Sequence, residues 1–471
     1  MPAHHVRLMR VACPAVAGIA LVIAAVLGES SWREKPAAVV IITLDTTRAD
    51  RLPVYGFMNA PMPNLERLAR EGIVFDRATS VAPLTLPAHC SLFTGLFPPA
   101  HGVRDNAGRP LAEDQTTLAE ILRAQGFRTG AFVGSVVLDA ERGLAQGFDH
   151  YSGVPGGEPP IRGFDARRRR ADAVITDALH WIEARDDTPF FAWVHLYDAH
   201  KPYATQEPFR SKYSDPYIAE IAFADSQIGR LLETLERRKI LDRTIVVVAG
   251  DHGEALGEHG ERDHGIFVYE SVLHVPLILR APSVAPRRVP GVVRLVDVMP
   301  TVLDLLGFSH PKLDGVSLVD MMRGETQQPE LDAYSESQYP LRFGWSPLRA
   351  LRAGRYKLIE APRPELYDLE RDPFEQQNIY EERRTLAAAM TRQLELVDHS
   401  GSAHDDGPDD APSAEWQQRL ASLGYVGATV SRDVANRRDL PDPKDCVGAV
   451  AGALPPQCGP QTGRSRYEAR R

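Results

Sequence analysis

Apolar residues follow two recurring patterns along the chain, continuous runs and helical spacing. Residues 37–44 (AAVVIITL) and 243–250 (RTIVVVAG) are nearly continuous apolar runs, which are typical of strands buried on both faces. Residues 63–72 and 226–241 place apolar side chains three and four positions apart, which predicts helices. The same patterns predict further strands at 128–138, 189–197 and 275–282 and a helix at 118–127. Alternating strands and helices predict an α/β fold, with a mostly parallel sheet sandwiched by helices.

The pattern changes after residue 330. Residues 331–399 contain short strand-like segments and turns, which predict a small antiparallel subdomain of the same fold. Residues 400–415 are acidic and rich in proline and glycine, and the last 35 or so residues lack any periodicity. We therefore expect residues 400–471 to form a linker and a disordered tail. Cys446 and Cys458 lie in this tail and are able to pair in an oxidising compartment.

Residues 1–36 have the character of a signal peptide or an N-terminal membrane anchor. Basic and histidine side chains precede an uncharged run of 18 residues, VACPAVAGIALVIAAVLG. Its length fits either interpretation. We therefore expect an exported protein, periplasmic or otherwise extracytoplasmic, either free or anchored to the membrane. The net charge of −9 gives no support to nucleic-acid binding, and the sequence leaves the oligomeric state open.

Two of the predicted buried strands end in acidic residues. Asp45 follows the first apolar run, and Asp251 and His252 follow the run at 243–250. Functional residues of such sheets gather at the carboxyl edge, so these three side chains are expected to lie close together. Carboxylate and imidazole groups suit a divalent cation such as Ca²⁺, Mn²⁺, Mg²⁺ or Zn²⁺. The sequence therefore predicts a metal site.

The segment APLTLPAHCSLFTG contains two candidate nucleophiles, Thr85 and Cys90. Pro87 fits the first turn of a helix. At about 100° per residue, His89 lies about 40° around this helix from Thr85, whereas Cys90 lies about 140° away. Thr85 and His89 therefore share a face, and Cys90 is expected to point into the core. On this segment alone, Thr85 is either the N-cap of the helix or a nucleophile.

Further polar residues follow predicted strands and helices. Asp198 and His200 end the strand at 189–197, His264 lies in a glycine-rich loop, and Asn106 follows the helix that carries Thr85. As a set they describe a polar cleft for an anion. Asp198, His200 and His264 also offer an alternative, a second cation site. The close spacing of Asp198 and His200 favours a single cation instead.

These residues resemble the sulfatase family of the alkaline phosphatase superfamily over roughly residues 37–380. The similar segments are ITLDTTRAD, TLPAHCSLFTG, GDHGE, VDVMPTVLDLLG and ELYDLERDPFEQQN. In the second segment Thr85 takes the place of the family's nucleophile, Pro87 that of its proline and His89 that of its arginine. The resemblance implies an alkaline-phosphatase-like fold, a catalytic domain at 37–330 and a packing role for Cys90.

The chain also departs from this family. Sulfatases convert a cysteine or serine to formylglycine, an aldehyde that threonine cannot give, so no formylglycine is expected. Ser135 and Val137 stand where the family has a lysine and a histidine. A threonine with an Asp-His metal pair is more similar to the phosphodiesterase and phosphonate monoester hydrolase branches. Among these relatives Asn106 matches a substrate-contacting asparagine, and His264 matches a lysine.

The resemblance implies an enzyme, a metal-dependent hydrolase that cleaves sulfate or phosphate esters by in-line attack of a metal-bound threonine. Its substrate would be an anionic ester of a small molecule, a glycan or a lipid. The implied catalytic residues are Thr85, His264 and His89, the substrate-binding residues are Asn106, His200 and Ser135, and the ligands of one divalent cation are Asp45, Thr85, Asp251 and His252. Two alternatives stay open, a phosphodiesterase or phosphonate monoester hydrolase and a catalytically inactive binding protein of the same fold.

Overall fold

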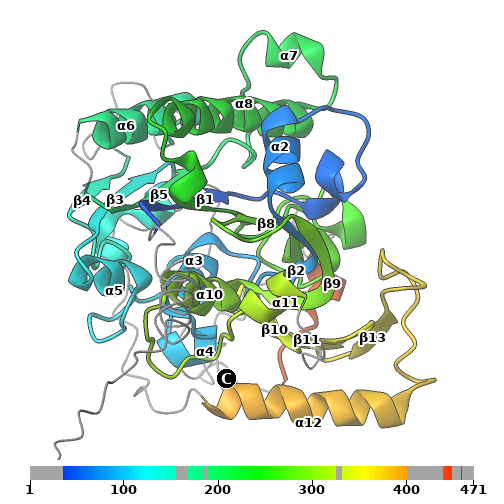
Figure 1. Ribbon diagram of the computed structural model, residues 1–471. Coiled ribbons are helices and arrows are strands. Elements are labelled where there is room, and N and C mark those ends of the chain that lie inside the picture. Colours follow the sequence, from blue (N-terminus) through cyan, green and yellow to red (C-terminus); the bar gives the residue numbers. More distant parts are fainter. Residues whose placement is uncertain are drawn as a thin grey trace, which may run out of the picture.

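The computed structural model describes residues 36–154, 168–184, 188–324, 331–400, 439–447 and 458. These residues form a large sheet between two layers of helices and a smaller antiparallel sheet beside it (Figure 1). The predicted α/β class is therefore confirmed. The predicted leader up to residue 35 and the linker at 401–438 lie outside the described residues. No helix within the described ranges combines the length and apolar character that crossing a bilayer requires.

The large sheet has nine strands in the order β4-β3-β5-β1-β6-β8-β2-β7, with β9 paired to β2. Its strands are β1 (Ala38–Leu44), β2 (Ile73–Thr79), β3 (Arg128–Val133), β4 (His150–Ser152), β5 (Phe190–Leu196), β6 (Thr244–Gly250), β7 (His274–Val275), β8 (Leu277–Arg280) and β9 (Arg287–Arg294). Strand β1 pairs in parallel with β5 and β6, and Leu44 lies opposite Leu196 and Gly250. The residues that follow these three strands therefore meet at one edge of the sheet.

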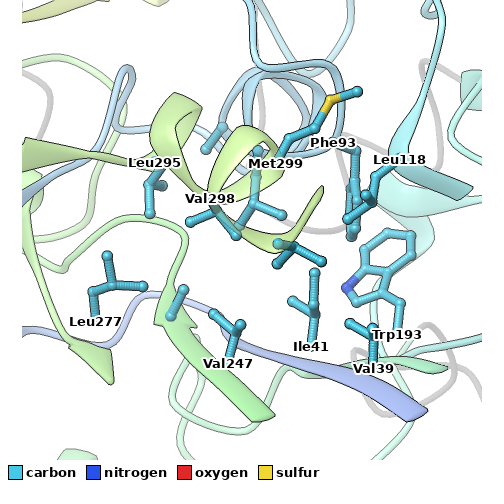
Figure 2. Packing of buried hydrophobic residues seen from close by; sticks show 14 of the residues in the cluster. Val39, Ile41, Phe93, Leu118, Trp193, Val247, Leu277, Leu295, Val298 and Met299 are labelled. Carbon is cyan, nitrogen blue, oxygen red and sulfur yellow. The ribbon is translucent and has the colours of Figure 1, made fainter. Parts of the chain in front are cut away.

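Alternate side chains of β1 pack against different helix layers, because successive residues of a strand point to opposite faces. Val40 and Ile42 belong to the core beneath α2 (Pro63–Glu71), α6 (Ala171–Glu183) and α8 (Pro216–Arg237). Val39 and Ile41 belong to the core shared with α3 (Thr85–Thr94), α5 (Leu118–Ala124) and α10 (Val298–Leu306). Figure 2 shows this second core, in which Ile41 lies below Val298 of α10. The continuous apolar run of β1 is thus explained by burial on both faces.

Three predicted element boundaries differ from the structure. Helix α8 begins at Pro216 instead of residue 226, because the Asp215 carboxylate accepts the N–H of Tyr217 (3.0 Å) and caps it there. Strand β3 ends at Val133 instead of residue 138, where the chain turns into a short 3-10 helix. The strand predicted at 275–282 is divided into β7 and β8 at Pro276, which has no N–H to donate to a neighbouring strand.

The remaining helices of the described residues up to the start of α12 are short. The short α-helices are α4 (Pro98–His101), α7 (Phe209–Lys212), α9 (Glu270–Leu273) and α11 (Val319–Arg323). The 3-10 helices are η1 (Ala49–Arg51), η2 (Pro53–Tyr55), η3 (Val136–Leu138), η4 (Ala140–Arg142), η6 (Leu241–Arg243), η7 (Glu258–Gly260), η8 (Leu295–Asp297) and η9 (Tyr339–Phe343). Several of them, such as η1 after β1 and η3 after β3, lie in the connections that follow strands.

The smaller sheet is antiparallel, in the order β10-β11-β12-β13. Its strands are β10 (Ala333–Ser337), β11 (Leu348–Ala353), β12 (Tyr356–Glu360) and β13 (Glu365–Asp368). Helix α12 (Arg384–Ser400) runs along this sheet (Figure 1) and buries Ala387, Met390 and Leu394 against it. Leu351, Leu358 and Leu366 of the sheet belong to the same core.

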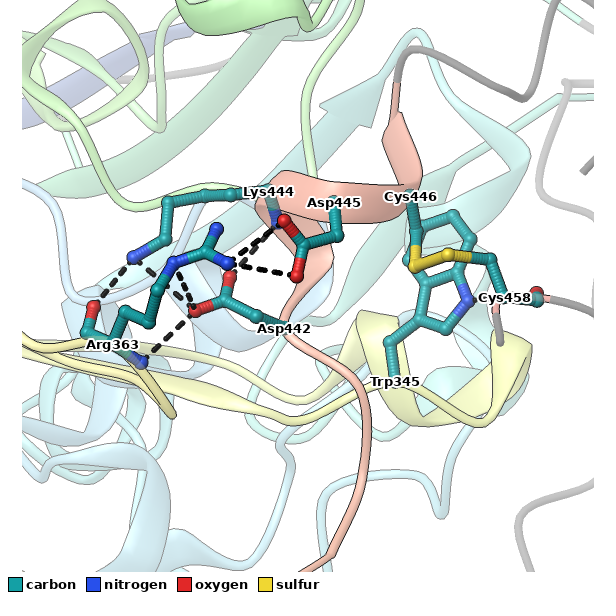
Figure 3. Close-up of a disulfide and its surroundings, with 7 residues drawn as sticks. All are labelled: Trp345, Arg363, Asp442, Lys444, Asp445, Cys446 and Cys458. Carbon is teal, nitrogen blue, oxygen red and sulfur yellow. Dashed lines mark hydrogen bonds and ion pairs between the residues drawn. A yellow bond between two sulfur atoms is a disulfide. The ribbon is translucent and has the colours of Figure 1, made fainter. Parts of the chain in front are cut away.

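Residues 439–447 pack against the smaller sheet, so the expectation of disorder is wrong for this part of the tail. The side chain of Asp442 accepts the N–H of Lys444 (2.9 Å) and caps α15 (Pro443–Cys446). The other oxygen of the same carboxylate accepts the backbone N–H of Arg363 (3.0 Å) (Figure 3). These polar contacts order the segment without the apolar periodicity on which the expectation of disorder depended.

A disulfide joins Cys446 to Cys458 (Figure 3). Both cysteines are buried beside Trp345, and the indole N–H of Trp345 donates to the carbonyl oxygen of Cys458 (3.1 Å). The pairing considered from the sequence is therefore present in the structure. It attaches Cys458 to the smaller sheet.

Candidate active site and metal centre

Three polar side chains meet where β1 and β6 end. Asp45 follows β1, and Asp251 and His252 follow β6. Each has one ligand atom within 4.8 Å of those of the other two, and all three residues are completely buried. Within the described ranges this is the one group of three or more such side chains that is arranged to hold a metal ion. The register of two neighbouring parallel strands brings together residues that are about two hundred positions apart in the chain.

The hydrogen bonds of this group leave its oxygens directed at one another. The backbone N–H groups of Thr46 and His252 donate to Asp251 Oδ1 (3.1 and 2.7 Å). Asp251 Oδ2 and both oxygens of Asp45 are buried without a hydrogen-bond partner. His252 Nδ1 donates to the carbonyl of Gly253 (2.9 Å) and therefore carries the proton of the neutral ring. Its unprotonated Nε2 faces the carboxylates. Two unsatisfied carboxylates and a bare imidazole nitrogen fit a divalent cation.

Burial controls the protonation of these groups. Burial raises the pKa of Asp45 to about 7, and burial together with the nearby Asp45 carboxylate raises the pKa of Asp251 to about 7. Burial also lowers the pKa of His252 to about 4. The carboxylates therefore lack sufficient compensating charge from the protein, which is the electrostatic condition in which a cation binds favourably.

Thr85 is the first residue of α3, and its side chain does not cap that helix. Its Oγ1 lies 3.3 Å from His252 Nε2, beside the carboxylates. The helix N-terminus is satisfied from elsewhere, because Asn106 Oδ1 accepts the N–H of Leu86 (2.8 Å). The interpretation of Thr85 as only a helix cap is therefore wrong. Asn106 is buried next to Thr85, and its Nδ2 has no hydrogen-bond partner.

His89 lies beneath the site instead of facing a substrate. Its Nδ1 bonds to the carbonyl of Thr85 (2.7 Å) and its Nε2 to Thr43 Oγ1 (3.0 Å). Because the ring is completely buried and both nitrogens are bonded within the protein, the expected contact with a substrate oxygen is not supported. Burial lowers the pKa of His89 to about 3, so this ring does not replace the positive charge of the family's arginine.

Three imidazole rings form a row beside Thr85. The ring of His264 lies 4.4 Å from that of His252 and 5.0 Å from that of His200. His200 Nδ1 donates to the carbonyl of Lys201 (2.6 Å), which leaves its buried Nε2 without a partner. His264 Nδ1 lies 3.4 Å from Glu254 Oε1. The predicted residues His200 and His264 are therefore brought together with the metal-binding group.

Asp198 and Ser135 have local structural roles. Both oxygens of Asp198 accept the backbone N–H of Ala171 at the start of α6 (3.1 and 2.9 Å). The alternative of a second cation site at Asp198 is therefore not supported. Ser135 accepts the N–H of Val137 (3.2 Å) and caps η3, so its expected substrate contact is not supported either. Serine and aspartate after a strand often cap the next helical turn in this way.

Several residues of this region did not emerge from the sequence analysis. Thr43 and His195 are polar residues inside the buried strands β1 and β5, and His195 Nε2 lies 3.3 Å from Asp45 Oδ2. Glu254 follows the metal-binding loop, is completely buried and has an unsatisfied Oε2. The sequence does contain a signal for Thr43 and His195. A threonine or histidine in an otherwise apolar buried strand requires a specific hydrogen-bond partner.

A large α/β sheet with helices on both faces, and a buried carboxylate–imidazole group at its carboxyl edge, defines the alkaline-phosphatase-like class of fold. Within this class, the chain belongs to the sulfatase family, whose profile matches residues 37–308, more than half of the chain. A second profile, that of the C-terminal region of N-sulphoglucosamine sulphohydrolase, matches residues 257–400. The resemblance inferred from the sequence motifs is confirmed.

Similar proteins include sulfatases from several bacteria. An ulvan-active sulfatase of Formosa agariphila is 27% identical over 399 residues, which cover 73% of this chain and 77% of that protein. A choline-sulfatase of Rhizobium meliloti is 28% identical over 437 residues, which cover 74% and 83%. The crystal structure of phosphonate monoester hydrolase of Agrobacterium radiobacter has a TM-score of 0.67 at 22% identity, covering 77% of this chain and 96% of that one. This structural similarity establishes the fold.

Proposed function

We propose that the protein is an exported hydrolase of sulfate or phosphate esters in which Thr85 is the nucleophile. The observation that carries the proposal is the position of Thr85 Oγ1, 3.3 Å from His252 Nε2 and beside two buried, unsatisfied carboxylates. Asp45, Asp251 and His252 would hold one divalent cation. When bound, the cation lowers the pKa of a nearby hydroxyl and offsets the negative charge of an anionic ester.

In the first step Thr85 Oγ1 attacks the sulfur or phosphorus atom in line with the leaving oxygen. A bond forms from Thr85 Oγ1 to that atom, the bond to the leaving oxygen breaks, and the hydroxyl proton of Thr85 passes to solvent. The buried Nδ2 of Asn106 donates a hydrogen bond to a nonbridging oxygen of the ester. The product of this step is an ester of Thr85 and a free alcohol or phenol.

The leaving oxygen requires a proton, which we assign to the pair formed by His264 and Glu254. Burial raises the pKa of Glu254 to about 8, so this carboxyl group keeps its proton near neutral pH. His264 transfers its Nε2 proton to the leaving oxygen while its Nδ1 receives the proton of Glu254. In the second step a water molecule attacks the Thr85 ester and one of its protons returns to this pair. The bond to Thr85 Oγ1 breaks and this oxygen regains a proton from solvent, which restores the starting state.

The nature of the nucleophile favours phosphate esters over sulfate esters. Formylglycine releases sulfate by collapse of its hydrate, whereas an ester of threonine requires a second attack at the central atom. Membership in the sulfatase family points instead to sulfate esters. Phosphodiesters and phosphonate monoesters are the second candidate substrates, supported by the threonine and the Asp-His pair. Small molecules, glycans and lipids are all suitable carriers of such a group.

The deciding experiment compares the protein loaded with different cations on four model substrates, an aryl sulfate, an aryl phosphate monoester, a diester and a phosphonate monoester. We expect turnover of at least one of them that is lost in chelator and regained with a divalent cation. Asp251→Ala should lose cation binding and turnover together, whereas Ser135→Ala should retain both. Unchanged metal content in Asp251→Ala would contradict the assignment of the ligands. Absence of turnover on every substrate with every cation would favour a binding protein of the same fold.

Export is part of the proposal. Its basis is the leader-like segment before residue 37, together with the Cys446–Cys458 disulfide, since disulfides persist mainly in oxidising compartments. Expression of the full chain followed by fractionation should recover the protein outside the cytoplasm. Mass spectrometry of its N-terminus then distinguishes a cleaved signal peptide from a retained anchor. Recovery in the cytoplasm with both cysteines reduced would contradict export.

A further inference from the structure

Two ion pairs hold the segment that carries Asn106 against the smaller sheet. Arg104 Nε donates to Glu336 Oε1 of β10 (2.7 Å), and Arg104 Nη2 donates to the other oxygen of the same carboxylate. Arg342 of η9 donates from Nε to Asp105 Oδ2 (3.0 Å) and from Nη2 to Asp105 Oδ1 (3.0 Å). Both pairs are bidentate, which fixes the angle as well as the distance between the partners. They involve the two residues that directly precede Asn106.

The carboxylates of these pairs are buried and fully hydrogen-bonded, whereas residues 102–105 lie outside the helices and strands. Asp105 Oδ1 also accepts the N–H of Ala107 (2.7 Å). Glu336 Oε2 also accepts the hydroxyl proton of Tyr334 (2.5 Å). Loss of one partner of a buried ion pair leaves an uncompensated charge, which is costly. Side-chain ion pairs therefore hold a segment that no regular backbone hydrogen bonding holds.

The opposite polarity of the two pairs specifies one register of the segment. Its arginine meets a carboxylate of the smaller sheet, and its carboxylate meets an arginine. A shift by one residue would set Arg104 opposite Arg342 or Asp105 opposite Glu336, and like charges at such a distance repel. Only one register forms both pairs, and the position of Asn106 is fixed with it.

Strand β10 also contacts the segments that carry the other candidate catalytic residues. The backbone N–H of Glu336 donates to the carbonyl of Val81 (2.9 Å), in the segment that leads into α3. The hydroxyl of Ser337 donates to the carbonyl of Gly265, next to His264. One strand of the smaller sheet therefore contacts the three segments that carry the candidate nucleophile, the substrate-binding amide and the proton donor.

We propose that Arg342 and Glu336 are positioning residues that hold Asn106 where its Nδ2 donates to a nonbridging oxygen of the ester. Asn106 Oδ1 is engaged by the N–H of Leu86 (2.8 Å), and its Nδ2 has no partner within the protein. The amide presents Nδ2 to the site only while its segment keeps one position relative to α3, and the ion pairs set that position. This inference rests on the proposed function and deepens it, because it gives the smaller sheet a part in substrate binding.

The first test measures the position of the segment without any substrate. Arg342→Gln and Glu336→Gln each remove one charge and leave a polar side chain. The backbone N–H groups of residues 103–108 should exchange with deuterium at least about tenfold faster in each variant, because the ion pair no longer opposes local opening. Arg355→Gln is the matched control, since Arg355 forms a similar bidentate pair with Asp368 of β13, at the opposite edge of this sheet from β10. Exchange of residues 103–108 should be unchanged in this control.

The second test shows whether the ion pair acts through Asn106. Arg342→Gln should lower kcat/KM on the preferred model substrate about tenfold, because small displacements of a substrate-positioning group are costly. Arg342→Lys keeps the charge without the fork and should recover part of this loss. In an Asn106→Asp background, which lacks the amide donor, adding Arg342→Gln should lower kcat/KM by less than about twofold. Arg355→Gln should leave kcat/KM unchanged in both backgrounds.

Two outcomes would overturn the proposal. One is equal exchange of residues 103–108 in the wild type and both glutamine variants. The other is an equal loss of kcat/KM from Arg342→Gln with and without Asn106→Asp, because a purely structural role affects both backgrounds alike. Absence of turnover by the wild type on every model substrate with every cation would instead refute the proposed function. Since the exchange measurement does not depend on turnover, the two failures are distinguishable.

Discussion

At the scale of single residues, the cap of α3 and the hydroxyl beside the metal-binding group come from two different side chains, Asn106 and Thr85. Asn106 Oδ1 accepts the N–H of Leu86 (2.8 Å) and so satisfies the N-terminus of α3. The hydroxyl of Thr85 remains beside His252 Nε2 (3.3 Å). Substitutions of these two residues should therefore affect stability and activity to different extents.

Thr85→Ala should abolish turnover with little change in stability. In the proposed mechanism the substitution removes the oxygen that forms the covalent ester, so the rate should fall by several orders of magnitude. The side chain of Thr85 does not cap α3 but is completely buried, so the cavity left by its removal should lower the free energy of unfolding by about 1 kcal/mol. Thr85→Ser keeps an oxygen in place and should retain part of the rate. Kinetics and melting curves of both variants test this, and an active alanine variant would identify water as the nucleophile.

Asn106→Ala should lower the free energy of unfolding by about 1 kcal/mol, because it removes the acceptor that caps α3. Asn106→Asp is the matched variant, since its carboxylate still accepts the N–H of Leu86 but no longer offers the buried Nδ2 donor. This second variant keeps the cap, so any loss of stability measures the cost of burying a carboxylate, and it should lose at least about tenfold in kcat/KM on an anionic substrate. Denaturant unfolding and kinetics measure the two effects. Equal kcat/KM for the wild type and Asn106→Asp would exclude the substrate contact.

At the scale of elements, α3 presents different chemistry on its two faces. Thr85 and His89 face the metal-binding group and β1, whereas Cys90 is completely buried in the apolar core. Burial raises the pKa of the Cys90 thiol above its ordinary value, so this side chain is a poor nucleophile. The spacing of these residues on the helix therefore predicts that Cys90 takes no part in the chemistry, although it is close to Thr85.

Cys90→Ala should therefore retain turnover within a few fold. Removal of the buried sulfur leaves a small cavity, which should lower the free energy of unfolding by about 1 to 2 kcal/mol. Activity assays and melting curves measure both effects. Mass spectrometry of the peptide that contains residue 90 should give the mass of unmodified cysteine. A mass corresponding to formylglycine at this position would disprove the packing role.

At the scale of the whole molecule, the candidate cation site links the central strands to the helix α3. Its two carboxylates have a raised pKa of about 7 because they are completely buried, compared with an ordinary value of 3.8. Between these two values the two carboxyl groups bind more protons in the folded, cation-free protein than in the unfolded chain. Their contribution to the free energy of unfolding should therefore fall as the pH rises from about 4 to about 7. A bound cation removes this destabilisation, because it compensates the same two charges.

A divalent cation should accordingly raise the melting temperature more at about pH 8 than at about pH 5, where protons compete for Asp45 and Asp251. Melting curves with chelator and with saturating cation, recorded across this range, measure the difference. Asp251→Ala, which removes one of the two carboxylates, should reduce both the effect of the cation and its dependence on pH. A stabilisation by cation that is the same at both pH values would contradict ionisation of these carboxylates on binding.

The sequence by itself determined the features that depend on local patterns. Apolar runs located the buried strands, and the acidic residues that follow β1 and β6 located Asp45 and Asp251. Helical spacing separated Thr85 from Cys90. These inferences succeeded because a strand buried on both faces is a continuous apolar run in the sequence, and because the carboxyl ends of parallel strands meet at one edge of the sheet.

Only the tertiary structure decided which partner each polar side chain finds. Asp198 is used to cap α6, although its position after a strand predicted a site. Ser135 caps η3, although the family resemblance implied a substrate contact. His195 lies beside Asp45 because the β1–β5 register sets His195 opposite Thr43, and no local pattern specifies that register. A hydrogen bond between residues far apart in the chain depends on how strands pair and helices pack. The location of the site was therefore determined by the sequence, and the roles of its polar residues by the fold.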